Sequence, residues 1–269
     1  MLSPKLVAKI ESEEPARRLA VLIDADNAQA AVIKELLAEI ARYGEATVKR
    51  IYGDFTAPTS ASWKKVLQTY AIKPVQQFAY TTGKNATDSM LIIDAMDLLY
   101  TGKFDGFCLV TSDSDFTGLA MRLREEGLTV LGFGEHKTPE AFRNACHQFI
   151  FTEILRSSDK MGASNSLAKT ENLQKQAEES VQDKSPKQQD DNFPKKLVLD
   201  ALEQSSDEEG WVQIGTFGSY LRKIKPDFDQ RLFGYKKFSE LVKAKTDIFA
   251  VEERSIPGSD KKDLYIRAK

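Results

Sequence analysis

Cysteine and histidine are scarce in this chain of 269 residues, which contains two of each. Cys108 and Cys146 lie in apolar stretches and form no CxxC pattern, so we interpret both as reduced core residues of a cytoplasmic protein. A disulfide between them is the alternative. His136 and His147 are too few for a His-rich metal site, and we interpret each as a surface or packing residue.

Long hydrophobic runs and a strong net charge are also absent. No apolar stretch approaches the ~18 residues that a membrane helix needs, so no contact with a membrane is expected. The first residues, MLSPKLVAKIESEEP, include acids and lack the apolar centre of a signal peptide. The formal net charge is only −2, so the charge of the whole chain does not indicate a nucleic-acid partner.

A polar segment divides the chain into two parts. Residues 157–192 are rich in Ser, Gln, Asn, Lys, Asp and Glu and contain no aromatic residue. Such a composition cannot bury enough apolar surface to form a core, so we predict a flexible linker there. The linker separates a first domain, residues 1–156, from a second domain, residues 193–269.

The first domain alternates between strand-like and helix-like stretches. Strands joined by helices of this length form βαβ units, so we predict an α/β fold with a mainly parallel sheet and helices on both faces. Such sheets bind ligands beyond the carboxyl ends of their strands. The predicted strands are Leu19–Asp24, Ala46–Gly53, Lys73–Tyr80, Gly106–Ser112, Leu128–Gly134 and Gln148–Thr152, and the predicted helices are Asn27–Gly44, Ser60–Ala71, Ala86–Gly102, Phe116–Gly127 and Pro139–Cys146.

The second domain has the pattern of a small winged helix (α+β), with three helices before two strands. Between Arg222 and Lys245, basic residues outnumber acids and aromatic residues alternate with them, a composition that suits a nucleic-acid surface. The alternative is a solvated Lys-rich face with the aromatic residues in the core, which we favour for Phe233 and Phe238. The predicted elements are the helices Pro194–Gln204, Thr216–Ile224 and Tyr235–Lys245 and the strands Ile248–Glu253 and Leu264–Arg267.

Carboxylates follow two of the predicted buried strands. The stretch LAVLID ends in Asp24, and FCLVTS is followed by Asp113 and Asp115. Capping of the next helix is the alternative role for each acid, and it explains one acid after a strand better than two. For Thr111 we favour helix capping.

A third acid is placed by helix geometry. At about 100° per residue, Asp88 shares the apolar face of the helix Ala86–Gly102 with Leu91 and Ile92. Asp94 and Asp97 point elsewhere, and we interpret both as ordinary solvent-exposed charges. For Asp88 the alternative is a first-turn acid stabilised by the helix dipole.

Together, these elements bring several carboxylates to one edge of one sheet. Like charges at close range repel each other unless a cation neutralises them. Oxygen ligands without Cys or His suit Mg²⁺ or Mn²⁺ rather than Zn²⁺. Acidic clusters that hold two such ions are the usual arrangement for in-line hydrolysis of phosphodiesters.

The motifs LIDADN, KNATD and LVTSDSDF, in this order within Arg18–Leu155, resemble the signature of NYN-domain proteins, the LabA-like branch of PIN-type nucleases. The resemblance implies a PIN-like fold and a metal-dependent endoribonuclease that uses Mg²⁺ or Mn²⁺. An RNA-binding adaptor without activity, built on the same fold, is the alternative. Asp26 stands where many members have a small residue, and it receives no role. The positions that match the family's acids and its Asn are Asp24, Asp88, Asp113, Asp115 and Asn27.

The tract RLFGYKKFSELV, with Gly210–Trp211 before it and a closing YIR strand, resembles the OST-HTH or LOTUS domain. This resemblance implies a module that binds RNA, single-stranded or structured, or a protein partner. Lys236 and Lys237 are our candidates for contacts to the RNA backbone. Ser112 and Lys84 are further candidates for contacts to RNA in the first domain, with a solvated side chain as the alternative for Lys84.

Two other enzyme classes fit the sequence less well. A haloacid-dehalogenase-type phosphohydrolase would use Asp24 as its nucleophile, but DADN lacks the Gly-Thr that usually follows in that family. No GxGxxG motif follows the first predicted strand, which disfavours Rossmann-type cofactor binding.

Overall fold

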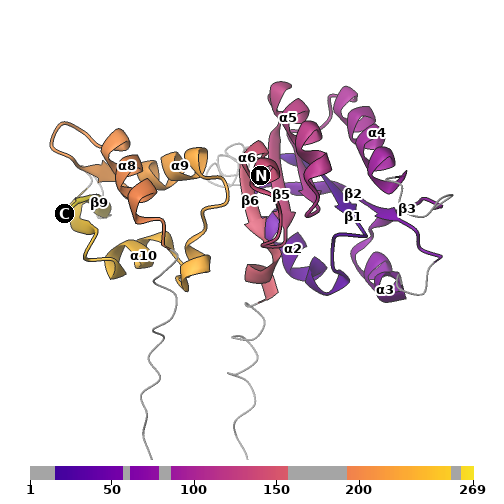
Figure 1. Cartoon of the computed structure of the whole chain (residues 1–269), viewed down its shortest axis with the longest axis horizontal. Coiled ribbons are helices and arrows are strands. Elements are labelled where there is room, and N and C mark those ends of the chain that lie inside the picture. The colour runs from indigo at the N-terminus through magenta and orange to yellow at the C-terminus, as the bar shows by residue number, and fades with distance from the viewer. Residues whose placement is uncertain (1–15, 57–60, 79–85, 157–192, 256–261) are drawn as a thin grey trace, which may run out of the picture. The chain divides into compact units, whose positions relative to one another are not determined.

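The computed structural model describes residues 16–56, 61–78, 86–156, 193–255 and 262–269 (Figure 1). These residues form two compact units, and each is described by itself. Within the described ranges, no helix is long and apolar enough to cross a membrane. Lys84 and the predicted linker lie outside the described residues.

Residues 18–151 contain a six-stranded sheet in the order β3-β2-β1-β4-β5-β6, and its first five strands along the chain belong to the first unit, which ends at Cys146. The pairs β1·β2, β1·β4, β2·β3 and β4·β5 are all parallel, which confirms the predicted α/β fold with a mainly parallel sheet. Both central strands are almost fully buried, as expected for a parallel sheet covered on both faces. The strands are β1 (Arg18–Asp24), β2 (Glu45–Gly53), β3 (Lys73–Gln76), β4 (Gly106–Val110), β5 (Thr129–Gly134) and β6 (Gln148–Phe151).

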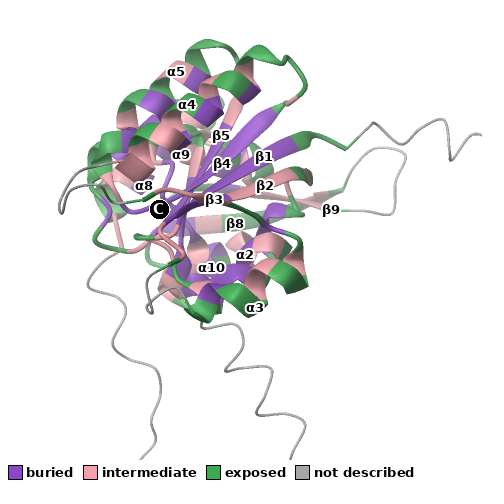
Figure 2. Ribbon diagram, turned by 90° about the vertical axis from the view of Figure 1, so that its right-hand side faces the viewer, coloured by how far each residue is buried: buried purple, intermediate pink, exposed green. Residues whose placement is uncertain are grey.

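Helices cover both faces of this sheet. Figure 2 shows α4 and α5 on one side of the buried strands and α2 and α3 on the other side. The helices are α2 (Ile33–Ile40), α3 (Ala61–Tyr70), α4 (Ala86–Tyr100), α5 (Thr117–Glu125) and α6 (Glu140–Ala145).

Two of the predicted helices begin later than expected, because polar side chains hold the preceding backbone in another conformation. The helix predicted from Asn27 begins as a 3₁₀ turn at Ala30, since Asp24 accepts hydrogen bonds from the backbone N–H groups of Asp26 and Asn27. The helix predicted from Phe116 is preceded by a 3₁₀ turn, Ser114–Phe116, which Asp113 caps.

The second unit is α+β, as predicted, and its antiparallel sheet has the order β7-β9-β8. The helix predicted over Tyr235–Lys245 is shorter, because Gly234 adopts φ 84° and ends a 3₁₀ turn before α10 begins at Phe238. Phe233 and Phe238 pack against the core, which confirms the role favoured for them. The elements are α8 (Lys195–Ser205), β7 (Val212–Gln213), α9 (Ile214–Ile224), α10 (Phe238–Ala244), β8 (Phe249–Ser255) and β9 (Lys262–Ala268).

Candidate metal site at the sheet edge

The order of the strands reverses between β1 and β4. From this pair, β2 and β3 extend to one side and β5 and β6 to the other. Open α/β sheets bind ligands beyond the carboxyl ends of the strands at such a reversal. Asp24 is the last residue of β1, and Asp113 follows the end of β4 at Val110. The fold therefore delivers both acids to the position where a ligand is expected.

Asp24 is completely buried, and four hydrogen bonds compensate for the loss of water around its carboxylate. Its Oδ1 accepts from the backbone N–H groups of Asp26 (3.0 Å) and Asn27 (3.3 Å). Its Oδ2 accepts from Asn27 Nδ2 (2.8 Å) and Thr111 Oγ1 (2.8 Å). Asn27 thus orients this carboxylate, and Thr111 joins β1 to the end of β4 instead of capping a helix.

Three carboxylates converge beyond Asp24. Asp88, in the first turn of α4, and Asp113 and Asp115, after β4, each offer one oxygen within 4.8 Å of the others. An ion held about 2.1–2.4 Å from each oxygen separates its ligands by at most about 4.8 Å. The spacing therefore fits one shared hard cation. Asp88 and Asp113 are half-buried and Asp115 is exposed, so one side of the group faces solvent.

The electrostatics of Asp88 agree with a cation site. Burial, followed by the charges of Asp24, Asp113, Asp115 and Asp26, raises the pKa of Asp88 from 3.8 to about 6. A helix N-terminus alone would have the opposite effect, because its dipole stabilises a negative charge. A divalent ion would favour the ionised form of all three carboxylates.

The acidic edge extends to β2. Burial raises the pKa of Asp26, and the charges of Asp24 and Asp54 raise it further. Asp54 directly follows β2, and its Oδ1 accepts a hydrogen bond from Gln76 Nε2 (2.8 Å). Asp54 was not among the acids predicted for this edge, although its place after a predicted strand was a usable signal.

Ser112 and Asp113 both have structural partners. Ser112 is buried, and its Oγ accepts from the backbone N–H of Glu135 at 2.9 Å, which joins the loops that follow β4 and β5. Asp113 Oδ1 accepts from the backbone N–H of Asp115 at 2.9 Å. Asp113 therefore caps the 3₁₀ turn and also belongs to the cluster of three carboxylates with Asp88 and Asp115.

Asp94 is not a solvent-exposed charge, and that prediction was wrong. It is 8% exposed and accepts hydrogen bonds from the Arg50 guanidinium and the Tyr52 hydroxyl. The cause is that α4 packs on both β1 and β2, so a wider part of the helix is covered than its apolar stripe indicates. Asp97 is exposed, as predicted.

The raised pKa of Asp88 gives a prediction for the metal-free protein. Between about pH 4 and 6 the folded state keeps a proton on Asp88 that the unfolded state has lost, so this group's stabilising contribution falls as the pH rises through this window. Asp88→Asn cannot ionise. In EDTA we expect it to raise Tm by about 3 °C near neutral pH and to leave Tm unchanged near pH 4. Scanning calorimetry measures both, with Asp97→Asn as the matched control; equal shifts at both pH values would contradict the prediction.

In the second unit, Lys236 and Lys237 are both exposed. Lys237 directly precedes α10, and its backbone N–H donates to Glu240 Oε2 at 3.2 Å. Gln230 Nε2 donates to the carbonyl of Lys236 at 3.4 Å. These two hydrogen bonds fix the backbone at Lys236 and Lys237, while both side chains are exposed to solvent.

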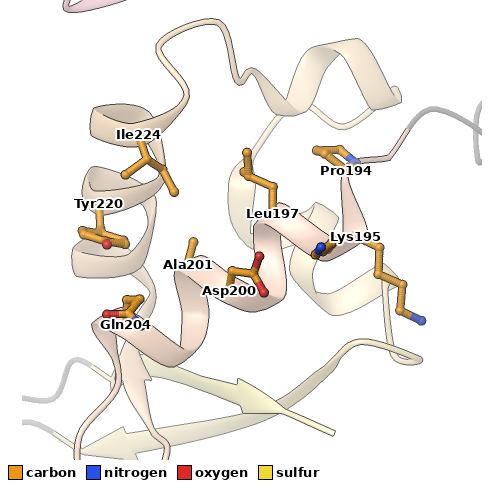
Figure 3. Close-up of a pocket in the computed structure, with 9 residues that line it drawn as sticks. Pro194, Lys195, Leu197, Asp200, Ala201, Gln204, Tyr220 and Ile224 are labelled. Carbon is orange, nitrogen blue, oxygen red and sulfur yellow. The ribbon is translucent and has the colours of Figure 1, made fainter.

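An open, mostly apolar groove of about 640 Å³ lies between α8 and α9. Figure 3 shows Leu197 and Ala201 on α8 opposite Tyr220 and Ile224 on α9. Its volume is within the range of ligand sites, about 300–1,000 Å³.

Comparisons with known proteins place these features in families. No curated protein matches the chain. An uncharacterized protein from Nitrosomonas europaea, solved by NMR, is 52% identical over 36% of this chain and 92% of its own, with a TM-score of 0.30. A crystal structure of a protein of unknown function from Vibrio parahaemolyticus is 15% identical over 52% of this chain and 95% of its own, with a TM-score of 0.44.

Two family models match the chain. The NYN domain matches residues 18–158, and the OST-HTH/LOTUS domain matches residues 190–259. NYN domains belong to the PIN-like nuclease superfamily, and both domain types are associated with RNA. The chain therefore belongs to the NYN domain family and carries an OST-HTH/LOTUS domain after its NYN domain.

Proposed function

We propose that this protein is a metal-dependent endoribonuclease, in which the NYN domain hydrolyses RNA phosphodiesters and the OST-HTH/LOTUS domain holds the RNA. The observation that carries the proposal is the convergence of Asp88, Asp113 and Asp115 within 4.8 Å at the reversal point of the sheet. Three carboxylates this close repel one another unless a cation neutralises them.

Asp88, Asp113 and Asp115 would hold Mg²⁺ or Mn²⁺, the ions that carboxylate oxygens prefer. Such an ion, when bound, lowers the pKa of water and offsets negative charge on a phosphate. Asp24 completes the acidic set from the buried side, and Asn27 and Thr111 fix its orientation. Since Ser112 is buried, we now assign it to holding the loop that carries Asp113 rather than to touching RNA.

The exposed Lys236 and Lys237 are our candidates for contacts to RNA phosphates in the second domain. Lys84 remains a candidate in the first. We propose the division predicted above, with residues 157–192 as a tether that raises the local concentration of RNA at the acidic edge. The free, buried thiols of Cys108 and Cys146 are consistent with the proposed cytoplasmic location.

The proposal is tested with a circular RNA that contains both single-stranded and hairpin segments. A circle has no ends, so only an endonuclease can convert it to linear products. With Mn²⁺ or Mg²⁺ we expect linear RNA, and with EDTA we expect binding without cleavage. Cleavage that persists in EDTA would exclude a metal-dependent reaction.

A second candidate function is an RNA-binding adaptor without activity. The hydrogen bonds that cap the 3₁₀ turn with Asp113 and orient Asp24 with Asn27 favour it, since they give these acids structural roles. The same circular RNA distinguishes the two candidates, because an adaptor binds it in Mn²⁺ and leaves it intact.

A further inference from the structure

The small sheet of the second unit has one face in the core and one face turned outward. Ile266 of β9 is completely buried and belongs to the core. Because successive side chains of a strand alternate between faces, Tyr265 and Arg267 lie on the other face. The register pairs Glu252 with Tyr265 and Arg254 with Asp263, so the outward face also carries Arg254 of β8.

Guanidinium groups lie over aromatic rings on this outward face. The guanidinium of Arg254 lies 4.4 Å from the ring centroid of Tyr265 and 5.1 Å from that of Trp211, which directly precedes β7. The guanidinium of Arg267 lies 4.9 Å from the Trp211 ring. All three distances are within the range of cation–π contacts. Solvent-facing sides of antiparallel sheets are usually polar, so two aromatic rings beneath two guanidinium groups are a distinct feature.

These groups remain accessible, and the outward face carries the carboxylates of Glu252 and Asp263 beside the two guanidinium groups. Arg267 is exposed, and the side chain of Arg254 is 34% exposed. Glu252 pairs with Arg254 at 3.3 Å, and Asp263 accepts a hydrogen bond from Gln213 at 3.2 Å. Among the residues that the structure describes, Arg267 has no carboxylate within 4.0 Å, although Asp207, Glu208 and Glu209 line the same pocket as Arg267.

We propose that Trp211, Arg254, Tyr265 and Arg267, here called the stacking face, bind unpaired bases of single-stranded RNA. Single-stranded RNA is recognised by stacking its bases on aromatic rings and on Arg guanidinium planes, while cations contact its phosphates. The stacking face supplies all three groups in an assembled form. The inference rests on the proposed function, in that RNA is the ligand, and adds a base-binding surface to the backbone contacts of Lys236 and Lys237.

Arg and aromatic side chains also dominate protein interfaces, so a protein is the competing occupant. The observations favour RNA, because the accessible guanidinium planes of Arg254 and Arg267 suit stacking on a base.

The test replaces the planar cations and keeps their charge. Arg254→Lys/Arg267→Lys in the full chain removes both guanidinium planes. In EDTA, which prevents cleavage, we expect its Kd for a single-stranded RNA of about 12 nucleotides to rise about tenfold. An abasic strand of the same length carries the same phosphates, and we expect it to bind the variant and the wild type equally. Equal affinity of both proteins for the base-containing RNA would overturn the proposal and favour a protein occupant.

A fluorescence measurement reports on the same face without changing it. The chain has two tryptophans, and Trp63 is buried in the first unit, so Trp63→Phe leaves Trp211 as the one indole reporter. We expect the RNA to quench this emission and the abasic strand to leave it unchanged. RNA binding without quenching would overturn the stacking proposal. Both measurements are made in EDTA and require no cleavage. Their outcome therefore does not depend on whether the protein cleaves the circular RNA.

Discussion

Asp113→Asn is expected to lower the rate of metal-dependent RNA cleavage by a hundredfold or more, because it removes one of the three charges that converge at the sheet edge. The fold should persist, since the Asn side-chain oxygen can still accept the hydrogen bond from the backbone N–H of Asp115. The measurement is the single-turnover rate on a circular RNA with saturating Mn²⁺, together with Tm.

The matched control is Asp97→Asn, which makes the same change of charge at an exposed position on α4. We expect this variant to cleave like the wild type. If both variants lost activity equally, the effect would be one of overall charge. If neither lost activity, Asp113 would have only its capping role.

The second large effect is expected on stability. Asp94→Ala removes the partner of both Arg50 and Tyr52, whose side chains point into the contact between β2 and α4. The side chain of Arg50 is 24% exposed and Tyr52 is completely buried, so neither regains a full water shell. We expect the free energy of unfolding to fall by about 3 kcal/mol, as for other broken buried pairs. Urea denaturation in EDTA measures this.

Two further variants test whether the loss of stability comes from the unpaired polar groups or from altered packing of the helix. Asp97→Ala, on the same helix, should change the free energy of unfolding by less than about 0.5 kcal/mol. Replacing all three members, with Arg50→Met, Tyr52→Phe and Asp94→Leu, leaves no polar group unpaired and should cost less than Asp94→Ala alone. A larger loss in the triple variant would contradict an explanation based on unpaired polar groups.

The sequence is informative where the determinants are local. A strand that ends in a carboxylate can be recognised from a few residues, so the sequence alone predicts Asp24 and Asp113 at the sheet edge. The place of Asp88 follows from helix periodicity in the same way. The two families are recognisable from short motifs, and the family models confirm both domains.

The missed features depend on partners that are distant in sequence. Asp94 is buried because Arg50 and Tyr52 lie 44 and 42 residues away on β2, which no helical periodicity reveals. The stacking face depends on strand register, which brings Trp211 to residues near the end of the chain. Thr111 was predicted to cap a helix. Its hydrogen bond to Asp24, 87 residues away, cannot be recognised from the local sequence either.

The crowding of acids around Asp88 has a thermodynamic consequence. Mutual repulsion raises the free energy of the folded metal-free state, whereas an ion that binds only the folded state lowers it in proportion to the logarithm of its concentration. Asp24, in contrast, is held in place by hydrogen bonds from the protein itself. On the proposed metal-dependent function, the conformational stability of this edge of the domain would therefore depend on the ionic composition of its surroundings as well as on the amino-acid sequence.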